Sequence, residues 1–197
     1  MGEIWAIILA AGESKRMGVP KMFLIFNGKT MLENVIANVT ASEVNNTIVV
    51  LGAEKDSLIE LVGKSDVLYC YNDKFKEGML SSVKCGFENL PSDYKAVLVF
   101  QGDQPFITPG SINTVIKAYL FSGKGIVIPT YQKKRGHPLL IDIKYRGEIE
   151  KLCSSKGLRS LADKFSDDVL EVDTDESGIL RDFDTYEEYE MEINQIK

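Results

Sequence analysis

A short glycine-rich stretch near the N-terminus holds the residues best suited to chemistry. It runs Leu9-Ala-Ala-Gly-Glu-Ser-Lys-Arg-Met-Gly-Val-Pro-Lys21 and carries three cations, Lys15, Arg16 and Lys21. Its glycines let the backbone approach a ligand closely, so that N–H groups can face phosphate oxygens. The cations can add charge-assisted hydrogen bonds. The stretch is therefore suited to hold a polyphosphate, although charge alone favours an ordinary exposed turn between a strand and a helix equally well.

Two common phosphate-binding loops do not fit this stretch. A Walker A loop requires Lys after its second glycine, whereas Val19 follows Gly18 here. The dinucleotide motif G-x-G-x-x-G is excluded because Ala10 and Ala11 precede Gly12. If the stretch binds phosphate, it is a loop of another kind.

Carboxylates follow two later segments. Asp103 comes just after the apolar run 95–100, in Gln101-Gly-Asp-Gln-Pro105. Open α/β sheets bind ligands past the carboxyl ends of their parallel strands, and Mg2+ needs only one or two carboxylates besides phosphate oxygens. Asp103 is therefore the first candidate for a Mg2+ ligand, with a simple turn before proline as the competing interpretation. Asp182 and Asp184 lie two residues apart, so in an extended segment both side chains point the same way.

Other polar positions have a structural interpretation beside any functional one. Ser81 or Ser82 can cap the helix that the following residues predict, and Thr185 with Glu188 predicts a capping box. His137 is the only histidine and stands between basic residues and an apolar strand. A lone histidine is more often structural or exposed than catalytic, and too few thiols accompany it for a zinc site.

Strand and helix patterns alternate along the chain and decide where these residues would lie. Apolar runs predict strands at 4–8, 47–51, 67–71, 95–100, 125–129 and 168–172. Helical patterns begin at Thr30, which starts a capping box with Glu33, and at Pro109, and also cover 55–62 and two short helices within 143–165. Such alternation predicts right-handed β-α-β units and a largely parallel sheet. No linker, repeat or low-complexity segment is found, so we expect one domain over residues 1–197.

The composition limits the class of protein. A chain of 197 residues that is 44% hydrophobic can bury a sizeable core. A net charge of -6 argues against a nucleic-acid binder with a basic face, but not against a nucleotide substrate. No apolar run approaches a membrane span, and no signal peptide is recognisable. Three scattered cysteines (Cys70, Cys85, Cys153) predict buried thiols, not a disulfide framework or a zinc site. We therefore expect a soluble cytoplasmic protein without nucleic-acid or membrane partners.

Five ordered motifs together resemble those of a known enzyme family. The string L-A-A-G-x-S-x-R-M-G-x-P-K is similar to the N-terminal signature of the MobA-like NTP transferases, which are related to the molybdenum-cofactor enzymes. G-M-x-S-S-x-x-x-G, G-D-x-P, R-G-H-P and D-x-D-T-x-x-E-Y resemble further motifs of this family, with Tyr186 in place of a usual proline in the last one. The resemblance covers nearly the whole chain. It implies an α/β fold with three layers, a Rossmann-like nucleotidyltransferase fold whose sheet is mostly parallel with one antiparallel strand.

The resemblance also implies which residues bind the nucleotide. Those of the loop are Leu9, Ala10, Ala11, Gly12, Ser14, Lys15 and Gly18. Within the same loop, Arg16 would contact the β- and γ-phosphates, and Lys21 would stabilise charge that develops at the α-phosphate. Ser81 and Ser82 would lie against the nucleobase and read the O2 and N3 atoms of cytosine. Two loop details, A-A-G and G-x-P-K, and the S-S segment favour the cytidylyltransferases of this group over their guanylyltransferase cousins.

For the metal and the acceptor the resemblance implies two further sets of residues. Mg2+ would be held by Asp103 and Asp184, with Asp182 beside them, and Asp103 would join Arg16 and Lys21 as a catalytic residue. His137 would contact or orient an anionic acceptor near its phosphate, with Arg135 as a helper.

The reaction implied is the transfer of CMP from CTP to the terminal phosphate of molybdopterin, with release of pyrophosphate. A molybdoenzyme or its chaperone is then a further expected partner. The alternatives are a guanylyltransferase, a transferase for another small phosphorylated acceptor, and a non-catalytic carrier of the cofactor. A carrier would be expected to lose Arg16, Lys21 or Asp103, and the presence of all three favours an enzyme.

Overall fold

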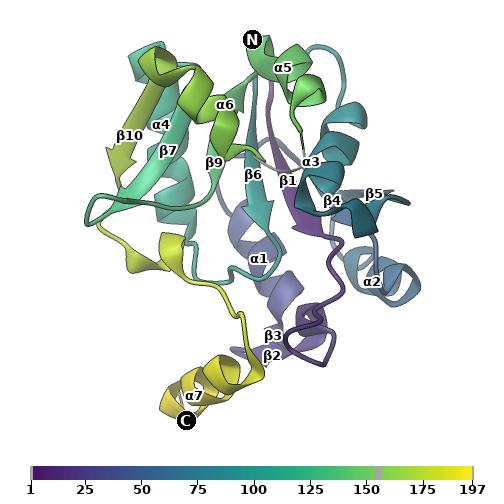
Figure 1. Cartoon of the computed structure of the whole chain (residues 1–197). Coiled ribbons are helices and arrows are strands. Elements are labelled where there is room, and N and C mark those ends of the chain that lie inside the picture. Colours follow the sequence, from purple (N-terminus) through teal and green to yellow (C-terminus); the bar gives the residue numbers. More distant parts are fainter. Residues whose placement is uncertain (1, 154–156, 197) are drawn as a thin grey trace.

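One mixed β-sheet forms the middle layer of the molecule (Figure 1). The computed structural model describes residues 2–153 and 157–196. The strands of the sheet are β1 (Ile4–Ala10), β4 (Asn46–Leu51), β5 (Leu68–Tyr71), β6 (Ala96–Gln101), β7 (Ile126–Tyr131), β8 (Lys134–Arg135), β9 (Leu139–Asp142) and β10 (Val169–Asp173). They are ordered β10-β7-β9-β6-β1-β4-β5, with β8 paired to β7. A separate hairpin pairs β2 (Ile25–Phe26) with β3 (Lys29–Thr30).

The central strand β1 pairs in parallel with β6 on one side and β4 on the other. Strand β9 is inserted between β6 and β7 and is antiparallel to both. This confirms the expected mostly parallel sheet with an antiparallel strand in its C-terminal half. The two-residue β8 adds a short antiparallel pairing that the sequence did not predict.

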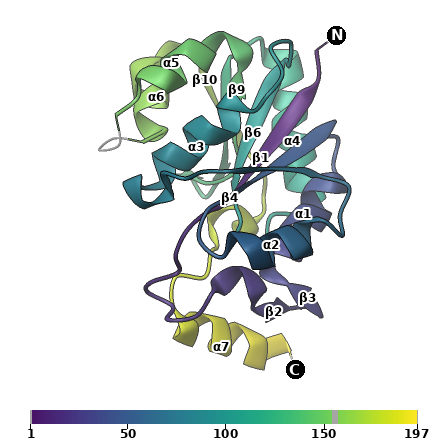
Figure 2. The ribbon, with the colours of Figure 1, turned by 90° about the vertical axis from the view of Figure 1, so that its right-hand side faces the viewer.

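Helices cover both faces of the sheet, as the turned view shows (Figure 2). The first face is covered by α1 (Met31–Thr40), α2 (Lys55–Val62) and α4 (Pro109–Ser122). The second face is covered by α3 (Met79–Glu88), α5 (Arg146–Lys151) and α6 (Arg159–Lys164). The last helix, α7 (Tyr186–Ile196), extends from the layers beside the β2–β3 hairpin. Short 3-10 turns are η1 (Lys21–Phe23), η2 (Phe75–Glu77), η3 (Ile143–Tyr145), η4 (Ser166–Asp168) and η5 (Ser177–Leu180).

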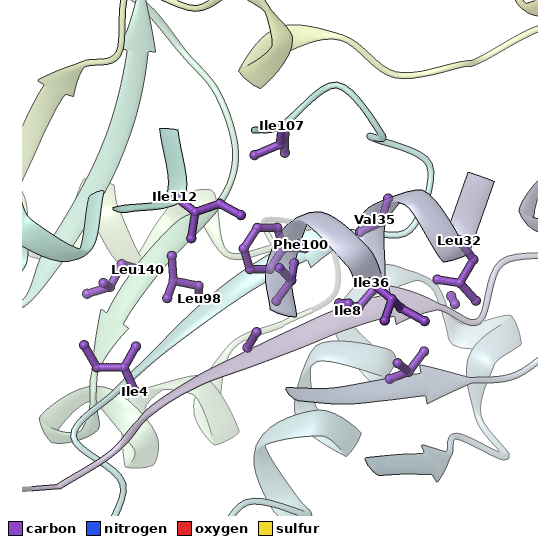
Figure 3. Close-up of a cluster of buried hydrophobic side chains, with 14 of the residues drawn as sticks. Ile4, Ile8, Leu32, Val35, Ile36, Leu98, Phe100, Ile107, Ile112 and Leu140 are labelled. Atoms are coloured by element: carbon purple, nitrogen blue, oxygen red, sulfur yellow. The ribbon is translucent and has the colours of Figure 1, made fainter. Parts of the chain in front are cut away.

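The alternation of side chains along β1 explains why two cores form. Ile4 and Ile8 point into the core under α1, α2 and α4, whereas Ile7 and Leu9 point into the core under α3, α5 and α6. Figure 3 shows the first core, where Phe100 of β6 lies among side chains of α1 and α4. Because β1 is buried on both faces, it reads as a continuous apolar run.

Most predicted helix starts are confirmed. Thr30 and Glu33 form the capping box of α1, and Thr108 caps α4, in which Pro109 is the first residue. The junction expected near Ser154 between α5 and α6 lies mostly outside the described residues. Among the described helices, none has the length and apolar character needed to cross a bilayer.

Candidate active site

The glycine-rich loop leaves the carboxyl end of β1 and returns toward the sheet at Lys21. Leu9, Ala10 and Ala11 are buried, and Gly12 is exposed with open space where a Cβ would be. Gly18 has a φ of +68°, a left-handed conformation that favours glycine. The hydroxyl of Ser14 accepts a hydrogen bond from the backbone N–H of Lys21 at 3.2 Å. The Ser14 carbonyl also accepts from the N–H groups of Met17 and Gly18, so Ser14 closes the loop on itself and leaves the exposed backbone from Gly12 to Arg16 to face a ligand.

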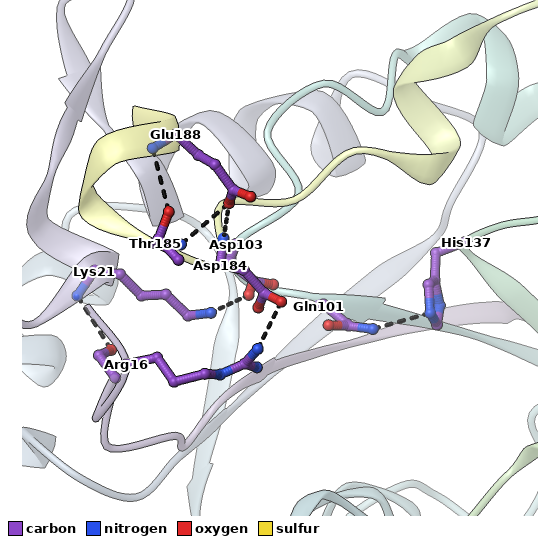
Figure 4. A network of polar contacts seen from close by, with 9 residues as sticks. Arg16, Lys21, Gln101, Asp103, His137, Asp184, Thr185 and Glu188 are labelled. Atoms are coloured by element: carbon purple, nitrogen blue, oxygen red, sulfur yellow. Dashed lines mark hydrogen bonds and ion pairs between the residues drawn. The ribbon is translucent and has the colours of Figure 1, made fainter. Parts of the chain in front are cut away.

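Lys21 and Asp103 meet at the carboxyl end of the sheet (Figure 4). The Lys21 ammonium donates to an Asp103 carboxylate oxygen, and their side chains are only 17% and 8% exposed. The parallel pairing of β1 with β6 brings these two segments together. Gly102 makes the approach possible, since its N–H donates to the Leu9 carbonyl and a Cβ there would stand 3.0 Å from that oxygen.

A second ion pair joins the loop to the C-terminal segment. Arg16 donates to Asp184 at 2.6 Å, and these side chains are 73% and 40% exposed. Phe183, between the two aspartates, is buried and packs edge-on against Phe26. Since neighbouring side chains in an extended segment point in opposite directions, burial of Phe183 turns Asp182 and Asp184 away from this apolar cluster.

The start of α7 fixes the same segment. Glu188 accepts hydrogen bonds from the N–H groups of Asp184 and Thr185, and its own N–H donates to the Thr185 hydroxyl. This confirms the predicted capping box.

Lys15 of the loop points into solvent and pairs with Glu13 at 2.8 Å, so that the loop offers less free positive charge than its sequence indicates.

Negative charge accumulates where a metal ion would be expected. The pKa of Asp182 is raised by desolvation and then by the charges of Asp103 and Asp184, against the attraction of Lys21. Within residues 2–153 and 157–196, no three His, Cys, Asp or Glu side chains are gathered closely enough to enclose a metal. Asp103 and Asp184 are instead engaged by Lys21 and Arg16. The joint metal site of the three aspartates thus stays a prediction, although its hard oxygen donors fit Mg2+.

Beside the Lys21–Asp103 pair lies a cavity of about 710 Å³. Its wall is largely apolar and comes from β1, α3, β6, β7, β9 and α6, with Leu9, Leu80, Val83, Val99, Ile128, Leu139 and Leu158 among its lining residues. Its polar groups include Gln101 and His137, and the basic residues at its edge are Lys133, Lys134, Arg135 and Arg159.

His137 is an uncharged group in this cavity. Burial lowers its pKa, and the opposing effects of the Asp103 charge and the Val99 backbone are smaller. Its Nε2 lies 2.9 Å from Gln101 Nε2, which as an amide nitrogen must donate, while Nδ1 is buried and lacks a hydrogen-bond partner among the described residues. Of the two roles expected for His137, orientation fits a neutral imidazole, and charge attraction does not.

Arg135 lies at the edge of the same cavity, but its charge is already paired. Its Nε donates to Glu171 at 2.7 Å. The backbone of this segment is held by Ile179, whose carbonyl accepts from the N–H of His137 at 3.0 Å. Arg135 and His137 are therefore brought together as expected, and an anion would have to compete with Glu171 for Arg135.

The expectation that Ser81 or Ser82 caps a helix is wrong. Helix α3 begins at Met79, before either serine, and its N-cap is Gly78, which has no side chain to accept hydrogen bonds from the first N–H groups. Both hydroxyls instead accept hydrogen bonds from Nδ2 of the buried Asn72, at 2.8 and 3.0 Å. The positive φ of Gly78 (+101°) starts the helix early, because only glycine adopts it without strain.

Three contributors to the site were missed at the sequence level. Gln101 holds His137, Asn72 holds Ser81 and Ser82, and Glu171 neutralises Arg135. Gln101 and Asn72 are polar residues at the end of, or just after, an apolar strand, the same signal that pointed to Asp103. Glu171 lies within a strand and gave no such signal.

A family model described as the MobA-like NTP transferase domain matches residues 6–169. The chain belongs to this family. The match includes the loop, Asp103 and the cavity residues from β7 and β9, whereas Asp182, Asp184 and α7 follow its end.

Among curated relatives, the bifunctional protein GlmU of Clostridium botulinum (strain Loch Maree / Type A3) is 31% identical over 156 residues, covering 77% of this chain and 34% of that protein. The chain spans 25% to 34% of the length of the first GlmU relatives it matches. A probable molybdenum cofactor guanylyltransferase of Methanosarcina mazei is 28% identical over 201 residues, covering 98% of this chain and 86% of that protein.

Among solved structures, Rv0371c from Mycobacterium tuberculosis H37Rv superposes with a TM-score of 0.83 at 23% identity, covering 98% of both chains. A structure of Rv0371c in complex with manganese gives 0.78 at 22% identity, covering 96% of this chain and 97% of that one. A nucleotidyl transferase from Methanothermobacter thermautotroptrophicus superposes with a TM-score of 0.84 at 21% identity, covering 99% of this chain and 98% of that one. These likenesses confirm the Rossmann-like nucleotidyltransferase fold.

Proposed function

We propose that this protein transfers CMP from CTP to the terminal phosphate of a molybdopterin-type cofactor and releases pyrophosphate. The observation that carries the proposal is the position of the buried Lys21–Asp103 pair, beside a largely apolar cavity with a basic edge. The pair and the loop suit the triphosphate, and the cavity suits an acceptor with an apolar body and an anionic end. Membership of the MobA-like NTP transferase family supports the reaction class.

The loop would hold the triphosphate. The N–H groups of Met17 and Gly18 already donate to the Ser14 carbonyl, so the exposed backbone from Gly12 to Arg16 would donate N–H groups to phosphate oxygens. Arg16 is mostly exposed and paired only through a solvent-accessible contact, so it can turn from Asp184 to the β- and γ-phosphates at little cost. Lys21 is held near Asp103 and would neutralise charge that develops at the α-phosphate. Lys15 would help to attract the nucleotide.

A divalent metal fits the carboxylates of this site. Asp103 and Asp184 would hold Mg2+, with Asp182 close enough for both charges to raise its pKa. When bound, the ion would neutralise phosphate charge and orient the reacting oxygens. The ammonium of Lys21 would then be released from Asp103 toward the phosphate.

The chemistry needs positioning rather than a covalent intermediate. A phosphate oxygen of the acceptor would attack the α-phosphorus, and the bond from that phosphorus to the bridging oxygen would break as pyrophosphate leaves. The attacking oxygen is already anionic, so no general base is required. Neutral His137, held by Gln101, would orient the acceptor from the wall of the cavity. Arg135 would exchange Glu171 for the acceptor phosphate.

The wall of the cavity favours a flat heteroaromatic acceptor over a sugar. Leu80, Val99, Ile128 and Leu139 offer no hydrogen bonds, so the hydroxyl groups of a sugar would lose water there without compensation. A pterin ring can stack its flat faces on such walls and turn part of its polar edge toward Gln101 and His137.

The start of α3 would recognise the nucleobase of the triphosphate. Gly78 leaves the first N–H groups of this helix without a side-chain cap, and Ser81 and Ser82 are fixed beside them by Asn72. The N–H groups match the O2 and N3 acceptors of cytosine, and the Ser81 hydroxyl, which donates to the Gly78 and Lys74 carbonyls, would have to turn toward the base to join them. The Methanosarcina mazei relative, a probable guanylyltransferase aligned over 98% of this chain, makes GTP the second candidate.

The test is pyrophosphate release by the purified protein with Mg2+, a molybdopterin-type acceptor and each of CTP, GTP, ATP and UTP. Release with CTP only is expected. Release with GTP only would replace the base assignment and keep the chemistry. Release only when a sugar 1-phosphate replaces the pterin would identify another acceptor, and no release with any pair would favour the non-catalytic carrier. The Lys21→Met variant serves as the inactive control in each assay.

A further inference from the structure

Two cysteines that are 15 residues apart in sequence meet beside the base-reading segment. Cys70 lies on β5 and Cys85 on α3, elements that lie side by side (Figure 1), and the two Sγ atoms are 3.7 Å apart. Cys70 is buried, Cys85 is half-buried, and Cys153 is exposed. The expectation of buried thiols thus holds for Cys70 but is wrong for Cys153. The contact of Cys70 with Cys85 could not be read from their spacing.

We infer that Cys70 and Cys85 form a reversible disulfide when the protein meets a peroxide, and that this bond weakens nucleotide binding. The oxidation concerns the two thiols alone. Its effect on the nucleotide rests on the function proposed above.

The two thiols differ in the way that such a reaction requires. The hydrogen bond with Cys70 lowers the pKa of Cys85, against burial and the charges of Glu88 and Asp73. The same contact and burial raise the pKa of Cys70. Cys85 is also the more exposed of the two and is therefore the thiol that reacts first.

The reaction balances with hydrogen peroxide as the oxidant. The Cys85 thiolate attacks one peroxide oxygen, the O–O bond breaks, and hydroxide leaves, giving a sulfenic acid. The Cys70 thiol then attacks the Cys85 sulfur, the S–S bond forms, and the S–O bond breaks. The Cys70 proton leaves with that oxygen as water. Two thiols and one peroxide thus give one disulfide and two waters, and an added thiol reverses the bond by exchange.

The disulfide would join β5 to α3, which Asn72, just after β5, already links through its hydrogen bonds to Ser81 and Ser82. Cys85 follows Ser81 and Ser82 by four and three residues, so all three lie on one face of α3. Cys70 precedes Asn72 by two residues, and Asn72 donates to both hydroxyls. A shift of β5 or α3 that brings the sulfurs to bonding distance therefore also acts on the hydroxyls one turn away.

Close packing limits how α3 can respond. A Cβ at Gly86 would stand 2.8 Å from the Ile7 side chain, so this part of the helix already lies against β1. Forming a bond of about 2.05 Å moves the sulfurs together by about 1.7 Å, and since α3 has no room to approach the sheet, rotation of the helix or of the two side chains, or a shift of the edge strand β5, supplies this movement. Loss of one well-placed hydrogen bond to the base corresponds to about fivefold weaker nucleotide binding.

The experiment treats the full-length protein with a small excess of hydrogen peroxide and maps its peptides by mass spectrometry, with and without a thiol reductant. We expect a linked peptide pair containing Cys70 and Cys85 that disappears on reduction. The Cys153→Ser variant, which keeps the pair, should give the same link. The Cys70→Ala variant should retain sulfenic or sulfinic acid at Cys85. Overoxidised Cys85 without a 70–85 link in the wild-type protein would overturn the inference.

Nucleotide binding is measured on the same samples by calorimetry. Oxidised wild-type protein should bind CTP about fivefold more weakly than reduced protein, and the Cys85→Ser variant should not respond to peroxide. A linked protein with unchanged affinity would refute the effect on the site. If reduced protein binds no nucleotide at all, the proposed function fails together with this effect, while the mapped link still tests the oxidation site.

Discussion

Replacing Lys21 by methionine separates the structural role of the Lys21–Asp103 pair from its chemical role. The substitution keeps most of the apolar stem of Lys21 and leaves Asp103, whose side chain is 8% exposed, without its cationic partner. Breaking a buried ion pair by removing one partner costs roughly 3 kcal/mol of unfolding free energy or more. For a chain of this size that corresponds to a melting temperature lower by about 6–12 °C.

The matched control is Arg16→Met, which breaks the other ion pair of the site. Its side chains are 73% and 40% exposed, so solvent screening leaves less than about 1 kcal/mol to lose. We expect its melting temperature to change by no more than about 4 °C. Both variants should lose at least a hundredfold in turnover, because each removes a charge that faces phosphate in the transition state.

A double variant, Lys21→Met with Asp103→Asn, completes the test. Removal of the stranded charge should restore most of the lost stability while turnover stays at the level of Lys21→Met. The measurements are thermal unfolding, urea titration and pyrophosphate release. A Lys21→Met protein that melts within 1 °C of wild type, or a double variant no more stable than Lys21→Met, would refute the account of a buried pair. Turnover restored in the double variant would refute the role of Lys21 at the α-phosphate.

Three further predictions concern other parts of the molecule. His137 is the only histidine, so its titration can be followed by NMR without ambiguity. Burial should place its pKa in the folded protein below the usual value near 6.5. Because the unfolded chain then binds the proton first, the free energy of unfolding should fall as the pH drops from about 6.5 toward the folded pKa. A measured pKa at or above 6.5 would contradict the buried neutral imidazole. The Thr30→Val variant should lose about 1 kcal/mol at pH 7 in urea unfolding, since it removes the cap of α1. Hydrogen bonds from the Thr30 side chain and backbone lower the pKa of Glu33 in the folded protein. In the wild-type protein the ionised Glu33 therefore contributes its full stabilisation above about pH 4.3, and this stabilisation is lost as the pH falls through the pKa of the folded state. Curves of unfolding free energy against pH that run parallel for the wild type and Thr30→Val would argue against this linkage. The Gly136→Ala variant should lose about 1–3 kcal/mol of unfolding free energy and raise KM for the acceptor more than for the nucleotide, because its Cβ would stand 2.4 Å from a backbone carbonyl oxygen beside the cavity. The control is Gly147→Ala in α5, which has open space at the Cβ; it should leave KM unchanged and gain up to about 1 kcal/mol from helix propensity.

The sequence predicted the sheet and most helices because these depend on local patterns. Apolar runs gave the buried strands, and Thr30 with Glu33 gave the start of α1. The pattern failed at α3, where Ser81 and Ser82 resemble helix caps but the helix begins at Met79. The buried amide of Asn72 pairs with both hydroxyls, and this partner lies on another element.

The charge state of a side chain could be predicted even less well. Arg135 and Lys15 read as free cations in the sequence, yet each is paired with a carboxylate, Arg135 with one 36 residues away. His137 reads as a titratable group near an anion, yet burial keeps it neutral. These properties depend on distance and desolvation, which arise only when distant strands pack together.

The sequence by itself determined the loop with its glycines and cations, the acidic residue after the central strand, and the two aspartates spaced to face one side. These follow from residue type, from the alternation of side chains along an extended chain, and from apolar runs that must be buried. Only the tertiary structure decided that Lys21 is bound to Asp103 and Arg16 to Asp184, and that Cys70 touches Cys85. Strand order and packing set those contacts, because they place residues side by side that are as many as 168 positions apart along the chain.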